Sequence, residues 1–412
     1  MTKRWSTLGL ATLAGISNLQ CAVPECATPD YTNPECRVIE ENDAARVQTS
    51  TLVEVRFQDP DVDDARSWDA TGLVEEVEPG VVRARVAGLG SFALTLERRP
   101  GGADSITLLL DNVSPDAIVS VGERGQEQDI PPEPSIRREL TIDLPDGAPV
   151  WVRGRVECAA RYRIAVTADI QTNPRQFERI VERLQDEARD SRERGEPLMG
   201  LVLNGDLSEA SRDDEFEIVQ TILGRLPIPT AVTPGNHDIY RPLRPLYNRL
   251  FGPGNHAFSV CTTRVVMLDT GSGTIARSIE GRLPELLDRR GSEFLIAGMH
   301  HPPYAGLTSA GWSSEQQAQR LLVELALADA DLVLAGHYHA LRQFDDIRVG
   351  KRSLRQIIVG TGGARQTVGV PRYGYLRLTF GESLDACFVE VPAPGYPEPP
   401  GGPISGLRYC ED

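Results

Sequence analysis

Five apolar runs of this 412-residue chain end in side chains that can bind metal ions. The runs are RIAVTAD, LVLNGD, TAVTPGNHD, FLIAGMHH and LVLAGHYH, which end at Asp169, Asp206, Asn236 to Asp238, His300 with His301, and His337 to His339. Five of the six histidines lie in these stretches. A single histidine is more often a satisfied or surface residue than a ligand, but this concentration of histidines and carboxylates predicts a functional site.

The types of these side chains indicate which ions they would hold. Aspartate, asparagine and histidine without cysteine suit Mn²⁺, iron or Zn²⁺ in a catalytic centre, rather than a closed structural zinc site. Two imidazoles stand two residues apart in Gly336-His337-Tyr338-His339, so that one loop can supply ligands to two ions. We therefore expect a dinuclear metal centre.

Strands that alternate with helices must position these side chains. Residues 158–391 show this alternation, which favours an α/β domain. The clearest helix begins at Asn173-Pro174, a cap residue followed by proline, and further helices are expected at 215–226 and from Ser314 to about Ala328. The carboxyl ends of strands in α/β sheets converge on one crevice, where all five stretches can meet.

Taken together, the motifs resemble those of the calcineurin-like metallophosphoesterases. Asp169, the Gly-Asp at Asp206, Gly-Asn-His-Asp, His-His-Pro-Pro and Gly-His-x-His follow one another in that family's order, and NHAFSV, VVMLDT and VGTGGA are similar to its connecting strands. The resemblance covers about residues 160–390. It implies a four-layer sandwich, with helices flanking two stacked sheets, and hydrolysis of phosphate mono- or diesters by metal-bound hydroxide without a covalent intermediate.

The resemblance also implies a role for each site residue. The first ion would be held by Asp169, Gln171, Asp206 and His339, and the second by Asp206, Asn236, His300 and His337. His237 would be the general acid, oriented by Asp238. Two ions about 4 Å apart can activate water and bind the transition state, while an imidazole protonates the departing alkoxide.

Two positions depart from the family pattern. Gln171 stands where the family commonly has histidine, so that it either supplies a weaker, neutral ligand or faces solvent and binds nothing. A carboxamide ligand would favour a harder ion or lower occupancy of the first site. Glu209 stands where purple acid phosphatases have their iron-binding tyrosine, so no tyrosinate-iron centre is expected.

Other candidate residues receive simpler interpretations. His301 is expected to pack beneath Pro302 and Pro303 or to touch substrate, His256 to be structural, and Asp269 to accept hydrogen bonds at a strand end. The chain has no G-x-S-x-G, no H-E-x-x-H and no G-x-x-x-x-G-K-[ST] motif, which disfavours serine esterases, zincin proteases and P-loop enzymes.

The N-terminal half predicts a different kind of domain. Residues 46–157 contain short alternating runs such as TLVEVRF and FALTLERR, separated by Gly, Pro and Asp. This spacing favours an antiparallel, immunoglobulin-like β-sandwich. It contains no histidine, so we expect no metal chemistry there.

The N-terminal segment indicates export. Residues 1–20 resemble a signal peptide, because Lys3 and Arg4 precede a charge-free, mostly apolar stretch. A polar tether is expected at 21–45 and an irregular Pro/Gly-rich tail at 392–412. Of the seven cysteines, Cys26 and Cys36 form the most natural local pair. Lipidation of Cys21 would leave six for three disulfides; alternatively, Cys21 is a free thiol or is removed with the signal.

The composition bounds the partners. A formal charge of −16 argues against binding of nucleic acid, which requires a concentrated cationic surface. We expect a small phosphate ester as substrate, and no protein partner is identifiable. The resulting hypothesis is an exported phosphoesterase of the cell envelope, periplasmic, surface-bound or secreted. The alternative is a weakened or inactive cell-surface binding module with one metal ion or none.

Overall fold

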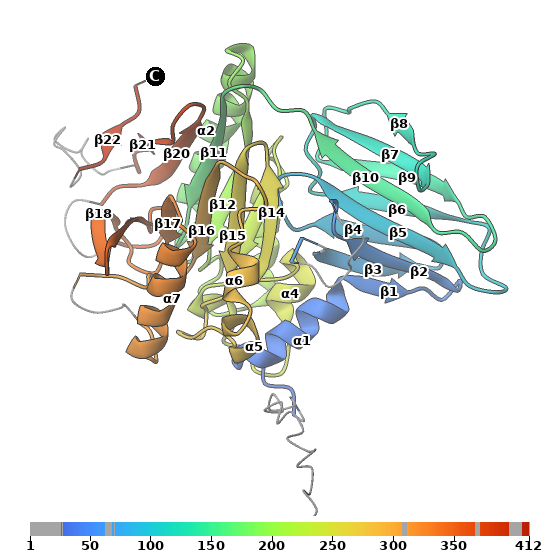
Figure 1. Cartoon of the computed structure of the whole chain (residues 1–412), viewed down its shortest axis with the longest axis horizontal. Coiled ribbons are helices and arrows are strands. Elements are labelled where there is room, and N and C mark those ends of the chain that lie inside the picture. Colours follow the sequence, from blue (N-terminus) through green and yellow to red (C-terminus); the bar gives the residue numbers. More distant parts are fainter. Residues whose placement is uncertain are drawn as a thin grey trace, which may run out of the picture.

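The computed structural model describes residues 26, 28–61, 68–69, 71–306, 311–366, 371–394 and 406–411. These residues form two parts that lie side by side, an N-terminal part of β-strands and a C-terminal α/β part (Figure 1). The predicted signal peptide and Cys21 lie outside the described residues.

The N-terminal part is a sandwich of two sheets. One has the strand order β1-β2-β5-β10-β7-β8 and the other β3-β4-β6-β9. The strands are β1 (Arg46–Gln48), β2 (Val53–Gln58), β3 (Gly72–Glu78), β4 (Val81–Val86), β5 (Phe92–Arg98), β6 (Ser105–Asp111), β7 (Ala117–Glu123), β8 (Gln128–Ile130), β9 (Arg137–Asp143) and β10 (Val150–Val156).

The core of this sandwich follows from the alternation seen in the sequence. Val55, Leu94, Leu108 and Val152 are buried in one cluster between the two sheets. The prediction of a β-sandwich is thereby confirmed, with one difference in strand direction. Strands β4 and β6 pair in parallel, because β5 between them in sequence crosses to the facing sheet.

The C-terminal part contains two further six-stranded sheets, with the orders β13-β12-β11-β20-β21-β22 and β14-β15-β16-β17-β19-β18. Their strands are β11 (Tyr162–Thr167), β12 (Leu198–Asn204), β13 (Thr230–Thr233), β14 (His256–Val260), β15 (Thr263–Leu268), β16 (Phe294–Met299), β17 (Leu332–Ala335), β18 (Leu341–Val349), β19 (Arg352–Val359), β20 (Gly374–Phe380), β21 (Asp385–Glu390) and β22 (Arg408–Tyr409). The helices are α2 (Pro174–Glu193), α3 (Asp213–Leu223), α4 (Leu246–Phe251), α5 (Arg277–Glu280), α6 (Leu283–Leu286) and α7 (Glu315–Leu327), with a 3₁₀ turn η1 (Asn236–Asp238).

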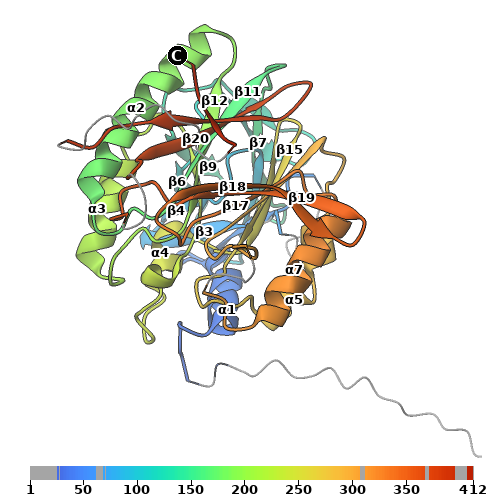
Figure 2. The ribbon, with the colours of Figure 1, turned by 90° about the vertical axis from the view of Figure 1, so that its left-hand side faces the viewer.

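Three apolar clusters hold these elements together as four layers. Helices α2 and α3 bury Phe177 and Phe216 against the first sheet, and α7 buries Leu321 against the second. Side chains such as Tyr162 and Met267 fill the space between the two sheets. Figure 2 shows α2 and α3 on one side of the strands and α5 and α7 on the other. The predicted four-layer sandwich is confirmed.

Parallel strands of both sheets precede the predicted site residues. Strands β11, β12 and β13 are parallel neighbours in the first sheet, and β16 and β17 are parallel neighbours in the second. The predicted cap of α2 is also present, since the Asn173 carboxamide oxygen accepts a hydrogen bond from the Gln176 N–H and proline follows the cap. The loops after these strands are therefore held at both ends by regular structure.

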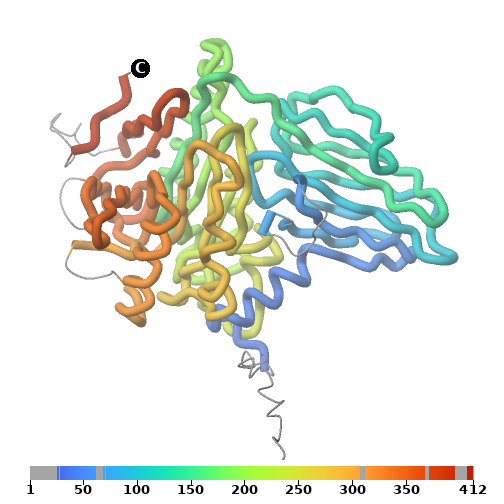
Figure 3. Tube along the Cα trace, in the orientation of Figure 1, coloured from blue at the N-terminus to red at the C-terminus, as the bar shows by residue number. Residues whose placement is uncertain are grey.

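The predicted tether of 21–45 contains a helix, α1 (Pro34–Ala44). Asn33 caps it, with its side chain accepting from the Glu35 N–H, and proline follows as in α2. The helix packs against α4, β1 and β3, and Figure 3 shows it between the two parts of the chain. Its buried Arg37 forms a bidentate ion pair with Asp269, at 2.6 and 2.8 Å. Residues 34–44 of the predicted tether therefore form a helix with buried contacts.

Three disulfides join distant or terminal segments. Cys26 pairs with Cys36 as predicted, Cys158 pairs with Cys261, and Cys387 pairs with Cys410. The last bond fixes the end of the predicted tail, where β22 pairs with β21. Within the described residues, no helix is both long and apolar enough to cross a membrane.

Polar side chains join the sandwich to the α/β part. The Asn112 carboxamide donates to the Val86 and Thr230 carbonyls at 2.7 and 2.8 Å and accepts from the Thr230 N–H at 2.7 Å. Arg85 is buried beside it and donates to the Phe251 carbonyl at 2.8 Å. Asn112 therefore pairs the backbone of β13 across the junction.

We expect Asn112→Ala to lower the free energy of unfolding by about 3 kcal/mol, because it removes the hydrogen-bond partner of the buried N–H and C=O of Thr230. Asn112 also has a φ of 65°, a conformation that asparagine tolerates better than alanine does. Guanidinium denaturation followed by circular dichroism would measure the change. Asn42→Ala removes an exposed carboxamide from α1 and should change stability by less than about 0.5 kcal/mol. Equal losses in the two variants would contradict the role assigned to Asn112.

Candidate metal centre

Five loops bring the predicted ligands together at the strand ends. Asp169 follows β11, Asp206 follows β12, Asn236 follows β13, His300 follows β16, and His337 and His339 follow β17. Asp169 accepts hydrogen bonds from the His337 N–H at 3.0 and 3.1 Å, and the Asp206 carboxylate lies 3.3 Å from His300 Nε2. The two sheets thus contribute to a single site.

The first group of potential ligands contains Asp169, Asp206 and His339, with ligand atoms within 4.8 Å of one another. Gln171 belongs to the same place, because its Nε2 lies 2.9 Å from His339 Nε2. The structure therefore brings together all four residues expected around the first ion, including the glutamine.

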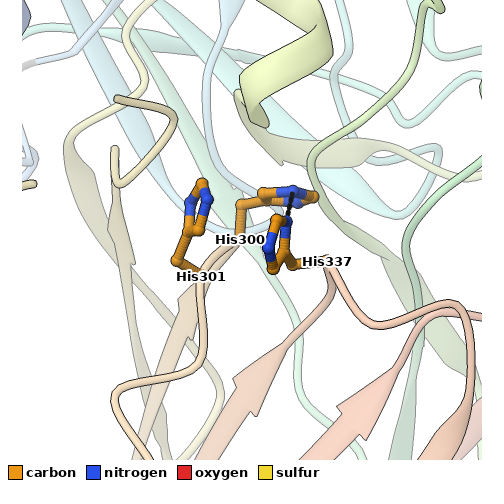
Figure 4. Close-up of side chains that lie close together, drawn as sticks. All are labelled: His300, His301 and His337. Atoms are coloured by element: carbon orange, nitrogen blue, oxygen red, sulfur yellow. Dashed lines mark hydrogen bonds between the residues drawn. The ribbon is translucent and has the colours of Figure 1, made fainter. Parts of the chain in front are cut away.

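The second group contains His300, His301 and His337 (Figure 4). Asn236 completes it, since its Oδ1 lies 3.1 Å from both His300 Nε2 and His337 Nδ1. His301 packs with its ring centre 4.1 Å from that of His337 and is buried. His301 therefore lies beside the candidate ligand His337. This is closer to the candidate metal centre than the predicted packing beneath Pro302 and Pro303 implies.

The backbone is bent where it presents these side chains. Asp169, Asp206 and His337 have φ values of 60°, 55° and 70°, in the left-handed region that residues other than glycine rarely adopt. Such strain persists where the surrounding structure enforces it, commonly at functional sites. Gly235 permits the close approach of two loops, because a Cβ there would lie 2.1 Å from Asp206 Oδ1.

The charges of the site are strongly coupled. Burial opposes ionisation of both Asp206 and His300, but their mutual attraction outweighs it, so that the pKa of Asp206 is lowered to about 2 and that of His300 is raised to about 9. Burial, with the charge of Asp206 added, raises the pKa of Asp169 well above its usual value. Metal binding must therefore displace the proton that His300 keeps at neutral pH.

The other two histidines of the second group are neutral at pH 7. Burial, reinforced by the charge of His300, lowers the pKa of His337 to about 4 and that of His301 to about 2. A neutral imidazole keeps a lone pair for a metal ion.

A second observation also indicates that these side chains can hold metal ions. The Oε1 atom of Gln171 is buried without a hydrogen-bond partner among the described residues. A carboxamide can present its oxygen in place of its nitrogen by rotation, and this oxygen is a neutral ligand of the predicted kind. An interpretation in which Gln171 faces solvent does not fit, since the residue is only 8% exposed.

Backbone carbonyls orient three of the imidazoles. The Nδ1 atoms of His237, His300 and His339 lie 2.7, 2.9 and 3.0 Å from the carbonyl oxygens of Glu209, Asn204 and Arg365. A carbonyl oxygen only accepts, so Nδ1 is the donor in each case. This leaves Nε2 of each neutral ring as the nitrogen with a free lone pair.

Asp238 has a different role from the predicted one. Its carboxylate accepts hydrogen bonds from the N–H groups of Leu207, Ser208 and Gly235, each at 2.9 Å, and from the Ser208 hydroxyl. It therefore ties together the loops after β12 and β13, whereas the Glu209 carbonyl orients the His237 imidazole. A sequence motif does not reveal this, because the acceptor is a backbone atom.

Two further predictions concern residues beside the centre. Asp269 accepts hydrogen bonds, as expected, from Arg37 and from the Gly271 N–H. His256 is buried next to the Phe258 ring, and burial lowers its pKa to about 3, in agreement with a structural role. Thr270, which sequence reasoning missed, accepts from the N–H groups of His300 and His301 at 3.1 and 2.8 Å.

Comparisons with known proteins agree with this geometry. Residues 162–341 match the family model described as calcineurin-like phosphoesterase. The chain is 29% identical over 115 residues to a glycerophosphodiester phosphodiesterase of Enterobacter lignolyticus, which covers 25% of this chain and 41% of the relative. It is 29% identical over 148 residues to a probable cyclic nucleotide phosphodiesterase of Synechococcus, which covers 34% and 57%. The chain thus spans about half the length of the curated relatives it matches.

Among solved structures, a purple acid phosphatase from yellow lupin is similar, with 14% identity, a TM-score of 0.45, and coverage of 73% of this chain and 70% of that one. The family match falls on the strands and loops that build the two ligand groups. The match confirms the predicted resemblance to the calcineurin-like metallophosphoesterases for residues 162–341, which lie in the α/β part of the chain.

Proposed function

We propose that this protein is an exported, metal-dependent hydrolase of phosphodiesters. The observation that carries the proposal is the pair of ligand groups around Asp206, whose carboxylate lies between His300 on one side and the group of Asp169 and His339 on the other. The names of the two sequence relatives, both phosphodiesterases, favour diesters over monoesters.

Different residues would hold the metal ions and protonate the leaving group. When bound, two metal ions would supply an activated water and hold the phosphate oxygens. Asp169, Gln171, Asp206 and His339 would hold one ion, and Asp206, Asn236, His300 and His337 the other, with His301 packed against the latter group. With both ring nitrogens protonated, His237 would give the proton on Nε2 to the leaving alkoxide, while Nδ1–H stays hydrogen-bonded to the Glu209 carbonyl.

The proposal of export is supported by the three disulfides. Such bonds persist in oxidising compartments and are rare in the cytosol. The binding-module alternative is less favoured, because a passive surface protein has no need of an imidazole held with its Nε2 free beside the ligand groups.

Asp206→Asn should abolish turnover of bis-p-nitrophenyl phosphate in chelator-stripped protein titrated with Mn²⁺. A carboxylate that would belong to both ligand sets is lost, so the decrease in kcat should exceed the roughly 100-fold that loss of an outer partner costs. Asp213→Asn, in an exposed ion pair with Arg244, is the matched control and should keep its activity. Full turnover of the substrate by Asp206→Asn, or no metal-dependent turnover by the natural protein, would contradict the proposal.

His237→Gln should distinguish substrates by their leaving groups. Diethyl phosphate needs protonation of its alkoxide, so its kcat should fall by about 100-fold or more, whereas p-nitrophenolate departs without a proton and its release should change little. The Asp213→Asn variant, which loses only an exposed ion pair with Arg244, should behave as the natural protein does on both substrates. Equal losses on both substrates would show that His237 is not the acid.

Gln171→Ala should weaken binding of one of two Mn²⁺ ions by about 10-fold or more, measured by titration calorimetry. Gln171→His, which restores the common family ligand, should bind both ions at least as tightly as the natural protein. If Gln171→Ala binds two ions with unchanged affinity, then Gln171 is not a ligand.

A further inference from the structure

The loop between η1 and α4 carries an exposed tyrosine beside the metal centre. Tyr240 is 48% exposed, yet its backbone is fixed, since its N–H donates to the Ser211 hydroxyl at 2.7 Å. The Ser211 hydroxyl in turn donates to the His237 carbonyl at 2.7 Å. An aromatic side chain held in this way, and still open to solvent, is available to a ligand.

The hydroxyl of Tyr240 contacts a predicted metal ligand. The Asn236 Nδ2 donates to it at 3.1 Å, while Oδ1 of the same carboxamide faces His300 Nε2 and His337 Nδ1. This hydrogen bond fixes the plane of the carboxamide, with the nitrogen turned outward and the oxygen turned toward the second group. Outer partners of this kind orient ligands and strengthen metal binding.

The ring of Tyr240 lies against the candidate acid. Its centre is 5.0 Å from that of the His237 imidazole, and the two planes are inclined by 57°. A leaving group that takes a proton from His237 must therefore lie within reach of the Tyr240 ring. Planar rings gain affinity by stacking on an exposed aromatic face, whereas short alkyl groups gain little.

We propose that Tyr240 positions Asn236 through its hydroxyl and receives a planar ring of the leaving group on its exposed face. The substrates would then be phosphodiesters of ring-bearing alcohols, of which nucleosides are one chemical class. The proposal rests on the proposed function, because it places the leaving group next to His237.

The positioning role is tested by metal binding alone. Tyr240→Phe keeps the ring and removes the acceptor of Asn236, so the affinity for one of the two Mn²⁺ ions should fall by about three- to tenfold in titration calorimetry. Tyr338→Phe is the matched control, since Tyr338 lies between His337 and His339, and no hydrogen bond of its hydroxyl is seen within the described part of the chain. Unchanged affinity in Tyr240→Phe, or an equal loss in Tyr338→Phe, would overturn this role.

The recognition role is tested with dibenzyl and diethyl phosphate, whose alkyl leaving groups differ mainly in the ring. The natural protein and Tyr240→Phe should both prefer dibenzyl phosphate in kcat/KM. Tyr240→Leu should lose that preference by about tenfold, mainly through KM, because the stacking surface is gone. An unchanged preference in Tyr240→Leu would overturn the recognition role.

The two assays separate this inference from the proposed function. If no diester is hydrolysed while Tyr240→Phe still loses metal affinity, the proposed function and the recognition role fail and the positioning role stands. If diesters are hydrolysed but neither Tyr240 variant differs from the natural protein, the proposed function stands and the inference fails.

Discussion

Two buried carboxylates in one site are the constraint around which this structure is arranged. Asp169 and Asp206 are 0% and 1% exposed, and their charges repel in a medium that screens poorly. Positive charge must compensate them, either from the protonated His300 or from metal ions. The left-handed backbone at both aspartates shows that the fold enforces this arrangement rather than relaxing it. A site of this kind is costly for the apoprotein and favourable for the metal-loaded one.

The N-terminal helix supports the loops of the second sheet that contribute side chains to this site. Arg37 of α1 binds Asp269 at the end of β15, and the next residue, Thr270, holds the N–H groups of His300 and His301. Glu41 of the same helix accepts from the Gly254 and Asn255 N–H groups, and the Asn255 side chain accepts from the Asp269 N–H. The segment before the sandwich is therefore part of the scaffold of the centre, although it lies more than 200 residues from Asp269 and Asn255 in sequence.

Much of the architecture could be predicted because it depends on local patterns. Strands that end in Asp169, Asp206 and His300, and the Asn-Pro cap of α2, are visible in the sequence, and parallel strands converge at one edge by geometry. The helix α1 begins with the same Asn-Pro pair. Because its residues are mostly polar, the sequence does not indicate that the face with Arg37 is buried. The contacts of Asn112 with Thr230 and of Tyr240 with Asn236 could not be predicted, because they depend on the placement of whole domains and on the course of a loop.

The motifs alone do not determine how each histidine is oriented. The Gly-Asn-His-Asp motif suggests that its aspartate orients its histidine, yet Asp238 binds backbone N–H groups of two loops and Glu209 orients His237 through its carbonyl. His300 and His339 are likewise held by carbonyls. Because a carbonyl can only accept, the backbone selects which nitrogen of each imidazole faces the site. The sequence therefore supplies the ligands, but the course of the main chain decides which atom of each one can bind an ion or carry a proton.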